Sequence, residues 1–521
     1  MKNKFIYLAI LSAGLFACEP EFENEISNGS YSAGEADFTS YVAIGNSLTS
    51  GVMDGTVSRG SQMYSFPNIL SQQFAIVGGG AFTQPSYTDD ANNLGGLLLM
   101  GNTVAATRMI INAGSGGPEN IAGTPTIEVS SLQATAYHNM GIPQAKTFHL
   151  LLPGYGNIAG LAATPPTANP YFVRHATSPM ATVMDDAMSK NPTFFTNWIG
   201  NNDVLGYATG GGTGNTAGLG GGDITPAPVF ESSYLEIIDK LTSNGAKGVV
   251  ATIPQVTSIP FFTTVSYNPL TAAAIGQGDE AAGIAAIQQL NAQLYGPVKQ
   301  ILTLFGQGDR INLLSETNGN PLLIKDETLQ DLGPQITAAA SASGNPVMMQ
   351  LAPFLGQTYG QVRHATASDL VLLPVSRLIG ASPSSSIPEP FNKFGITYPL
   401  QDEHILIPSE ITEINAATLN FNNIIKSAAA SKNLAVADMT QILEQLVSGL
   451  RTEDGQIYTA DYFSTANIGT VLFSLDGIHP NARGYAVISN EIIKVINRHY
   501  GAKLPLVSAG NYPGATVLPS N

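Results

Sequence analysis

The chain changes from apolar to polar within YVAIGNSL, residues 41–48. A short apolar run that ends in glycine is typical of a buried strand, so we expect a strand over residues 41–44. Ser47 then lies just past the strand end, where Gly45 allows the backbone to turn tightly. A helix that begins nearby would direct its first N–H groups at an anion. Taken alone, this serine also fits the N-terminal cap of a helix.

Strands and helices alternate along the rest of the chain. Four more short apolar runs are expected to form strands, at residues 134–140, 193–199, 248–253 and 434–437. Apolar residues at helical spacing indicate helices within residues 64–74, 234–241 and 411–428. This alternation predicts an α/β fold whose parallel sheet of about five strands is covered by helices on both faces. In such a sheet the ligand site lies beyond the carboxyl ends of the strands.

Three stretches fall outside this pattern. Residues 77–130 are rich in Gly, Thr, Ser and Pro and predict irregular surface structure. The glycine-rich segment 206–222 lacks the strand context and the lysine of a phosphate-binding loop, so we expect a mobile loop that borders the active-site mouth. Residues 263–400 are predicted to be an insertion that serves as a cap, a substrate platform or a surface elaboration.

The composition is that of a folded protein with few charges. Hydrophobic residues make up 44% of the 521 residues, which excludes a disordered chain. Charged residues make up only 12%, against roughly 25% in typical soluble domains, and such a polar but uncharged surface suits a secreted protein. The formal net charge is −16, with no basic run beyond the first residues. A nucleic-acid partner would be repelled, so we exclude that class.

The first 18 residues differ from the rest. Lys2 and Lys4 precede an apolar stretch, residues 5–16, that is too short to span a bilayer stably. Cys18 is the sole cysteine, so it forms no internal disulfide. This start resembles a bacterial lipoprotein signal, which predicts a signal peptide over residues 1–17 and lipid attached to Cys18. An ordinary secretory signal with an incidental cysteine is the alternative.

The resemblance to a lipoprotein implies a location in the cell envelope. The protein would be anchored by its lipid to the outer membrane, at the cell surface. The acidic stretch that follows, residues 18–37, predicts a solvated tether. The folded domain is expected over residues 38–503, and residues 504–521 are expected to form a C-terminal tail.

A second polar cluster ends the expected strand at residues 193–199. Asn202 lies in the run Gly-Asn-Asn-Asp, residues 200–203, where a side-chain amide can donate to a developing oxyanion. Asp203 is expected to brace the same loop. Taken alone, this run is an ordinary turn. Trp198, the only tryptophan, is assigned to the core.

The third cluster is DGIHP, residues 476–480, which lies 429 positions after Ser47 (476 minus 47). Two residues separate Asp476 from His479, so in a turn their side chains lie side by side. Pro480 keeps His479 out of the helical conformation, and a helix can begin with this proline in its first turn. A helix-capping aspartate with a surface histidine is the alternative reading.

The three clusters together resemble the conserved blocks of the SGNH hydrolases, also called GDSL esterases and lipases. The resemblance runs from about residue 41 to residue 499 and implies a flavodoxin-like three-layer α/β/α fold. It implies that Ser47 is the nucleophile, His479 the general base and Asp476 the residue that orients the base. The oxyanion would be held by the Ser47 N–H and the Asn202 amide.

Two positions depart from the family pattern. Asn46 stands where an aspartate usually precedes the serine. The family's second block supplies a glycine N–H to the oxyanion, and its best match here, residues 138–145, places Gln144 at that position. A glutamine retains the backbone donor if its conformation suits a side chain. Gly154 is the alternative donor.

These observations predict a serine esterase that hydrolyses an acylated glycan or lipid through an acyl-enzyme, without a cofactor. An O-acyltransferase is chemically adjacent, and a catalytically inactive surface-binding lipoprotein is the alternative from another class. We predict no metal site, because the remaining histidines lack close ligand spacing. They are His138, His149, His175, His364, His404 and His499. The sequence leaves the oligomeric state open.

Overall fold

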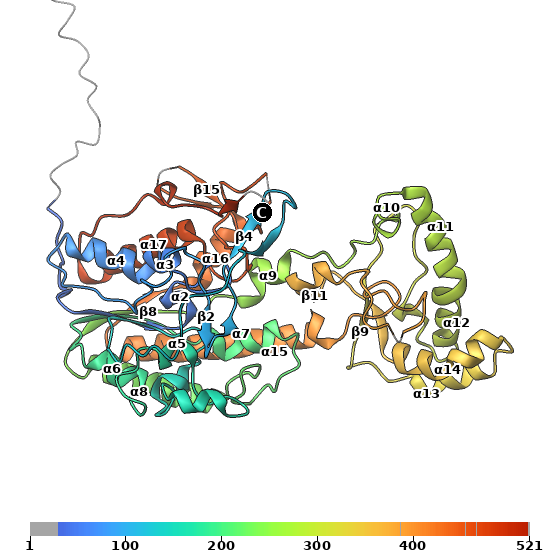
Figure 1. Ribbon diagram of the computed structural model, residues 1–521, viewed down its shortest axis with the longest axis horizontal. Helices are drawn as coiled ribbons and strands as arrows, with labels where there is room; N and C mark the ends of the chain where they lie inside the picture. Colours follow the sequence, from blue (N-terminus) through green and yellow to red (C-terminus); the bar gives the residue numbers. More distant parts are fainter. Residues whose placement is uncertain (1–29, 386, 454, 465, 519–521) are drawn as a thin grey trace, which may run out of the picture.

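The computed structural model describes residues 30–385, 387–453, 455–464 and 466–518 (Figure 1). The predicted signal peptide, the predicted lipidation site at Cys18 and the first part of the predicted tether lie outside these residues. None of the helices in the described ranges combines the length and the apolar character needed to cross a bilayer.

A five-stranded parallel sheet forms the centre of the molecule. Its strand order is β13-β8-β7-β1-β6, and each neighbouring pair is parallel. The strands are β1 (Tyr41–Gly45), β6 (Asn139–Gly141), β7 (Phe194–Trp198), β8 (Lys247–Ala251) and β13 (Ala435–Ala437). Every residue of β1 and β7 is buried, because both faces of the sheet are covered, and this explains the apolar run of β1. All five predicted strands are confirmed, although β6 comprises only the end of the predicted stretch.

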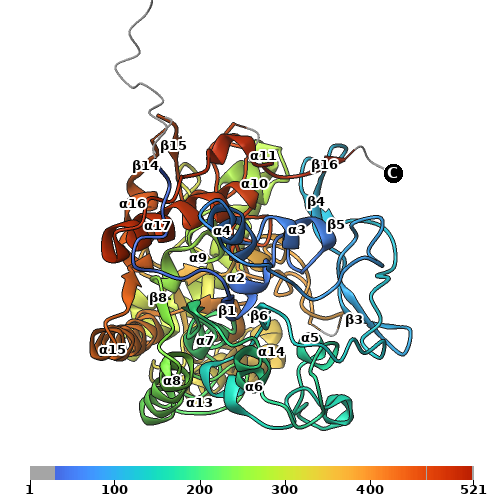
Figure 2. The same cartoon turned by 90° about the vertical axis from the view of Figure 1, so that its left-hand side faces the viewer.

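Helices lie on both faces of this sheet (Figures 1 and 2). One face carries α4 (Phe66–Ala75), α16 (Met439–Ser448) and α17 (Ala482–Tyr500), and the other carries α6 (Val183–Met188), α8 (Ala227–Thr242) and α15 (Pro408–Ser431). The three predicted helices correspond to α4, α8 and α15. In α8 the side chains of Tyr234, Ile237 and Leu241 are fully buried, as their spacing on one helix face requires. The mixed α/β architecture with a parallel sheet is therefore confirmed.

Part of the segment expected to be irregular forms short strands. These are β2 (Leu97–Leu99), β3 (Asn102–Ala105), β4 (Met109–Asn112) and β5 (Pro118–Asn120). The prediction was wrong here because glycine-rich turns break the apolar residues into runs too short to recognise. Near the chain end, β16 (Val517–Leu518) pairs with β4, so the expected C-terminal tail packs onto this region.

The glycine-rich segment is partly helical. Residues 206–209 belong to α7 (Asn202–Thr209), which corrects the prediction that the loop begins at residue 206. The remaining loop is closed on itself, because the Asp223 side chain at its end accepts hydrogen bonds from the N–H groups of Asn215 and Gly220. The Lys146 ammonium group also donates to the Gly220 carbonyl, at 2.7 Å.

The predicted insertion forms a lobe to one side of the main body (Figure 1). It contains α10 (Ala272–Ile275), α11 (Glu280–Leu290), α12 (Gly296–Leu304), α13 (Gly333–Ser341), α14 (Pro346–Tyr359), β9 (Leu323–Lys325) and β10 (Val362–His364). Inside the lobe, Arg363 bridges two carboxylates, Asp326 and Asp369. The lobe joins the body near α9 (Pro260–Thr263) and the strand pair β11 (Leu370–Val371) and β12 (Ile405–Leu406).

Candidate active site

Ser47 and the Asp476/His479 pair meet at the carboxyl end of the sheet. His479 Nε2 lies 2.9 Å from Ser47 Oγ, and His479 Nδ1 lies 2.7 Å from Asp476 Oδ2. Two segments from opposite ends of the chain are thus joined by one chain of hydrogen bonds. The structure brings together all three residues that the sequence singled out as a triad.

Ser47 does not cap its helix. It is the first residue of α2 (Ser47–Ser50), and Asn46 is the cap, because its side chain accepts the Leu48 N–H at 3.1 Å. This arrangement leaves the Ser47 hydroxyl free to face the imidazole. Gly45 is required by the tight turn, since a Cβ there would lie 2.1 Å from Thr49 Oγ1.

The Asp476 carboxylate is held by donors at both oxygens. Oδ1 accepts the N–H groups of Ile478 and His479, each at 2.9 Å, and the Ser474 hydroxyl at 3.0 Å. Oδ2 accepts the Gly55 N–H at 2.9 Å in addition to the imidazole. Burial raises the pKa of Asp476, but the charge of His479 and these hydrogen bonds outweigh it and lower the pKa to about 2. The group is therefore an anion that orients the His479 imidazole through Nδ1.

The turn that follows α2 forms a brace for the histidine loop, which was not predicted from the sequence. Asp54 accepts the Leu475 N–H at 3.1 Å through its side chain, and its own N–H donates to Ser474 Oγ at 3.0 Å. Burial raises the pKa of Asp54 to about 6, and the nearby Asp476 charge adds to this effect. The Asp-Gly pair at residues 54–55, which favours tight turns, was the available signal.

The histidine loop also contacts the base of the lobe. The Phe261 N–H donates to the Gly477 carbonyl at 2.9 Å. Gly477 adopts a φ of +73°, which favours glycine, and a Cβ there would lie 2.8 Å from Leu373 Cδ2 and 3.1 Å from the Phe261 nitrogen.

Three N–H groups lie at the ends of neighbouring strands and are candidates to hold an oxyanion. They belong to the backbone of Ser47, the backbone of Gln144 and the side chain of Asn202. Within the part of the chain that the structure describes, neither backbone N–H has an acceptor. One hydrogen of the Asn202 amide bonds the Ala145 carbonyl at 3.0 Å, and the second remains available.

Gln144 occupies a conformation that favours glycine. Its φ is +66°, and it follows Pro143 in a turn closed by the Ala145 N–H and the Ile142 carbonyl at 3.1 Å. The hydrogen bond from Asn202 to Ala145 places Gln144 next to Asn202. Among the described residues, no hydrogen bond connects Gly154 to Ser47, Asn202 or His479.

Asp203 fastens α7 to the segment after Gln144, as expected. Its Oδ2 accepts both the N–H and the hydroxyl of Thr147, each at 2.9 Å. The side chain is fully buried, and burial raises the pKa of Asp203 to about 6. The brace fixes the position of Asn202 relative to Gln144.

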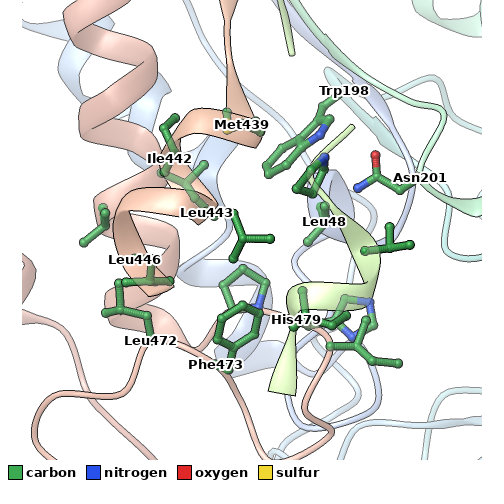
Figure 3. A pocket seen from close by; sticks show the side chains of 18 of the residues that line it. Leu48, Trp198, Asn201, Met439, Ile442, Leu443, Leu446, Leu472, Phe473 and His479 are labelled. Atoms are coloured by element: carbon green, nitrogen blue, oxygen red, sulfur yellow. The ribbon is translucent and has the colours of Figure 1, made fainter. Parts of the chain in front are cut away.

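A cavity opens beside the triad (Figure 3). Its polar side chains are those of Ser47, Asn201, Asn202 and His479. The rest of the wall is apolar and comes mainly from α16, α17 and the segments after β7 and β8. It includes Leu48, Trp198, Val256, Ile259, Met439, Ile442, Leu443, Leu446, Leu450, Leu472, Phe473, Ile478, Val487 and Ile488. The insertion 263–400 contributes none of the lining residues. Trp198 is buried, as predicted, and its ring also forms part of the wall.

The structure also brings together three carboxylates that the sequence did not connect. Oxygens of Glu327, Asp402 and Glu410 lie within 4.8 Å of one another, although 83 positions separate the first residue from the last (410 minus 327). Burial, together with the neighbouring charges, raises the pKa of Glu410 to about 8 and that of Asp402 to about 6. None of the three lines the cavity beside Ser47.

Comparison of the chain with protein-family models, with curated proteins and with solved structures finds no match.

Proposed function

We propose that the protein is a serine esterase of the SGNH hydrolase type, which cleaves carboxylic esters through an acyl-enzyme. The observation that carries the proposal is the unbroken chain of hydrogen bonds from Ser47 Oγ through His479 to Asp476. A serine hydroxyl becomes an effective nucleophile when an oriented imidazole accepts its proton. The strand order also supports a flavodoxin-like fold. Numbered by position in the chain, the sheet reads 2-1-3-4-5 from β6 to β13.

In the first half of the proposed reaction, Ser47 Oγ attacks the ester carbonyl carbon as its proton passes to His479 Nε2. The carbonyl oxygen becomes an oxyanion held by the N–H groups of Ser47, Gln144 and Asn202. When the intermediate collapses, the bond to the alcohol oxygen breaks and His479 returns the proton to that oxygen. The alcohol leaves, and the acyl group remains on Ser47.

In the second half, water attacks the acyl-enzyme and gives a proton to His479. The bond to Ser47 Oγ then breaks, and the proton returns to the serine. The products are a carboxylic acid and regenerated enzyme. Asp476 remains ionised throughout, because its pKa of about 2 lies far below the pH at which a neutral imidazole can act.

The test compares Ser47→Ala with Ser50→Ala. Both residues lie in α2, but the Ser50 hydroxyl bonds the Ser47 carbonyl rather than the imidazole. We expect Ser47→Ala to abolish both p-nitrophenyl acetate hydrolysis and labelling by a fluorophosphonate, and Ser50→Ala to retain both. Unchanged turnover in Ser47→Ala would reject the mechanism. Product analysis with an added sugar acceptor separates hydrolysis, which releases free acid, from acyl transfer, which forms a new ester.

The proposal includes attachment to the outer membrane through lipid on Cys18. Metabolic labelling with a palmitate analogue is expected to mark the wild-type protein and not Cys18→Ala. Equal labelling of the two proteins would contradict this attachment.

A further inference from the structure

The cavity beside Ser47 has polar groups at one end and hydrocarbon elsewhere. In Figure 3, Leu446 and Leu472 lie on the opposite side of the view from Asn201 and His479. We propose that this cavity binds the acyl chain of a medium-chain fatty acyl ester. The inference rests on the proposed esterase function. It adds which half of the substrate the cavity binds and how long that half is.

The size of the cavity sets the chain length. The space open to the centres of water-sized groups is about 110 Å³. A closed apolar cavity of roughly 150 Å³ binds a benzene ring, and the present cavity, of similar size, is open on the side of the triad. An acyl chain of medium length, such as octanoyl, can therefore extend into it, whereas an acetyl group would leave it nearly empty.

Because the wall of the cavity is apolar, it favours binding of the acyl half of the ester over binding of the alcohol half. A sugar or glycerol placed there would lose its hydrogen bonds to water and find few partners, which is unfavourable. The acyl group, by contrast, is bonded to Ser47 through both half-reactions and can stay in place. The alcohol must depart from the side of His479, and water must enter there, so this side must remain open to solvent.

One wall of the cavity is a well-fixed amphipathic helix. In α16 the side chains of Leu443 and Leu446 are buried, whereas that of the adjacent Val447 is 57% exposed. Asp438 caps the helix and forms an ion pair with Lys426 at 2.8 Å. A larger side chain at position 446 would therefore enter the cavity, and the same side chain at position 447 would point into solvent.

The first experiment measures kcat/KM for p-nitrophenyl esters from acetate to dodecanoate, each below its micelle concentration. We expect kcat/KM to rise about fourfold for each added methylene until the chain reaches roughly eight to ten carbons, and then to level off. Leu446→Trp should lower the ratio of kcat/KM for octanoate to kcat/KM for acetate by about tenfold, because it fills the space of roughly two methylenes. Leu446→Ala should move the optimum to longer chains, and Val447→Trp should reproduce the wild type.

The second experiment detects binding without catalysis. Trp198 is the only tryptophan and forms part of the wall, so its emission reports on the occupant. In Ser47→Ala we expect 8-bromooctanoate to quench this emission saturably, and octanoate without bromine to compete.

The outcomes separate the two proposals. Quenching without turnover or labelling of the wild type would support the acyl site and reject the esterase. Ser47-dependent hydrolysis of acetate without quenching, or with a rate that follows the length of the alcohol instead of the acyl chain, would overturn the acyl site and leave the esterase standing.

Discussion

Replacing Asp476 with asparagine removes the charge of this side chain and keeps its shape. Three groups donate hydrogen bonds to Oδ1, and they belong to Ile478, His479 and Ser474. These groups would hold the amide oxygen of the asparagine at the same position. The amide NH₂ would then occupy the position of Oδ2, which lies 2.7 Å from His479 Nδ1 and 2.9 Å from the Gly55 nitrogen.

An NH₂ group at that position has two consequences. It donates to His479 Nδ1 and fixes the imidazole proton on Nε2, which then cannot accept the proton of Ser47. In serine proteases the equivalent change lowers kcat about 10⁴-fold with the geometry intact. We expect a fall of about 10³–10⁴-fold here, or about 4–5.5 kcal/mol in the barrier. The NH₂ also faces the Gly55 N–H, which loses its acceptor; because Gly55 is exposed, water can replace this bond, and the free energy of unfolding should fall by no more than about 1 kcal/mol.

The assay is hydrolysis of p-nitrophenyl acetate, with urea unfolding as the measure of stability. Asp54→Asn is the matched control, because an asparagine there keeps the acceptor for the Leu475 N–H and does not touch the imidazole. We expect the control to retain kcat within about tenfold. A folded Asp476→Asn protein whose kcat stays within tenfold of the wild type would refute the argument about the tautomer.

Three further predictions concern the oxyanion donors and the carboxylate cluster. Asn202→Ala should lower kcat about 10²–10³-fold with little change in KM, since its free N–H acts mainly in the transition state; a purely structural role would instead lower the melting temperature. Gln144→Gly should keep kcat within about twofold and raise the free energy of unfolding by about 0.5–1 kcal/mol, because the φ of +66° suits glycine and the N–H remains. In the wild type, Glu410 stays protonated up to a pKa of about 8 in the folded state, against an ordinary value of 4.5. The contribution of Glu410 to stability should therefore fall as the pH rises from 4.5 to 8, so that Glu410→Gln should be more stable than the wild type at pH 9 by on the order of 2–4 kcal/mol but not at pH 4, as measured by urea unfolding at each pH.

The sheet could be predicted because the start and end of its strands can be recognised from the local sequence. Buried parallel strands are apolar on both faces, and β1 ends at Gly45 where the chain must turn. The predicted strand at residues 134–140 failed in its first half, since Ala134 adopts a φ of +44° and Thr135 bonds the His175 carbonyl instead of the sheet. The helix after Pro480 begins at Ala482, because the Asn481 side chain caps it by accepting the Gly484 N–H.

Within the candidate site, the geometry could be predicted only where the residues lie close together in the sequence. Two intervening residues place Asp476 beside His479 in a turn, and this geometry can be read from the sequence. The apolar wall could not be predicted, because Leu443, Leu446 and Leu472 have the spacing of ordinary core residues. The carboxylate cluster and the brace at Asp54 depend on contacts between distant segments, which a single sequence does not reveal.

The two halves of the triad are joined by more than the hydrogen bond between Ser47 and His479. The Tyr485 hydroxyl donates to the Val52 carbonyl at 2.6 Å, and Asp54 and Gly55 hold Leu475 and Asp476. These contacts come from the turn directly after α2, so the segment that carries Ser47 also anchors Asp476, whose carboxylate orients His479. Removing the serine hydroxyl leaves every one of them in place. Ser47→Ala should therefore unfold at nearly the wild-type urea concentration, and its loss of activity would report on chemistry and not on collapse of the site.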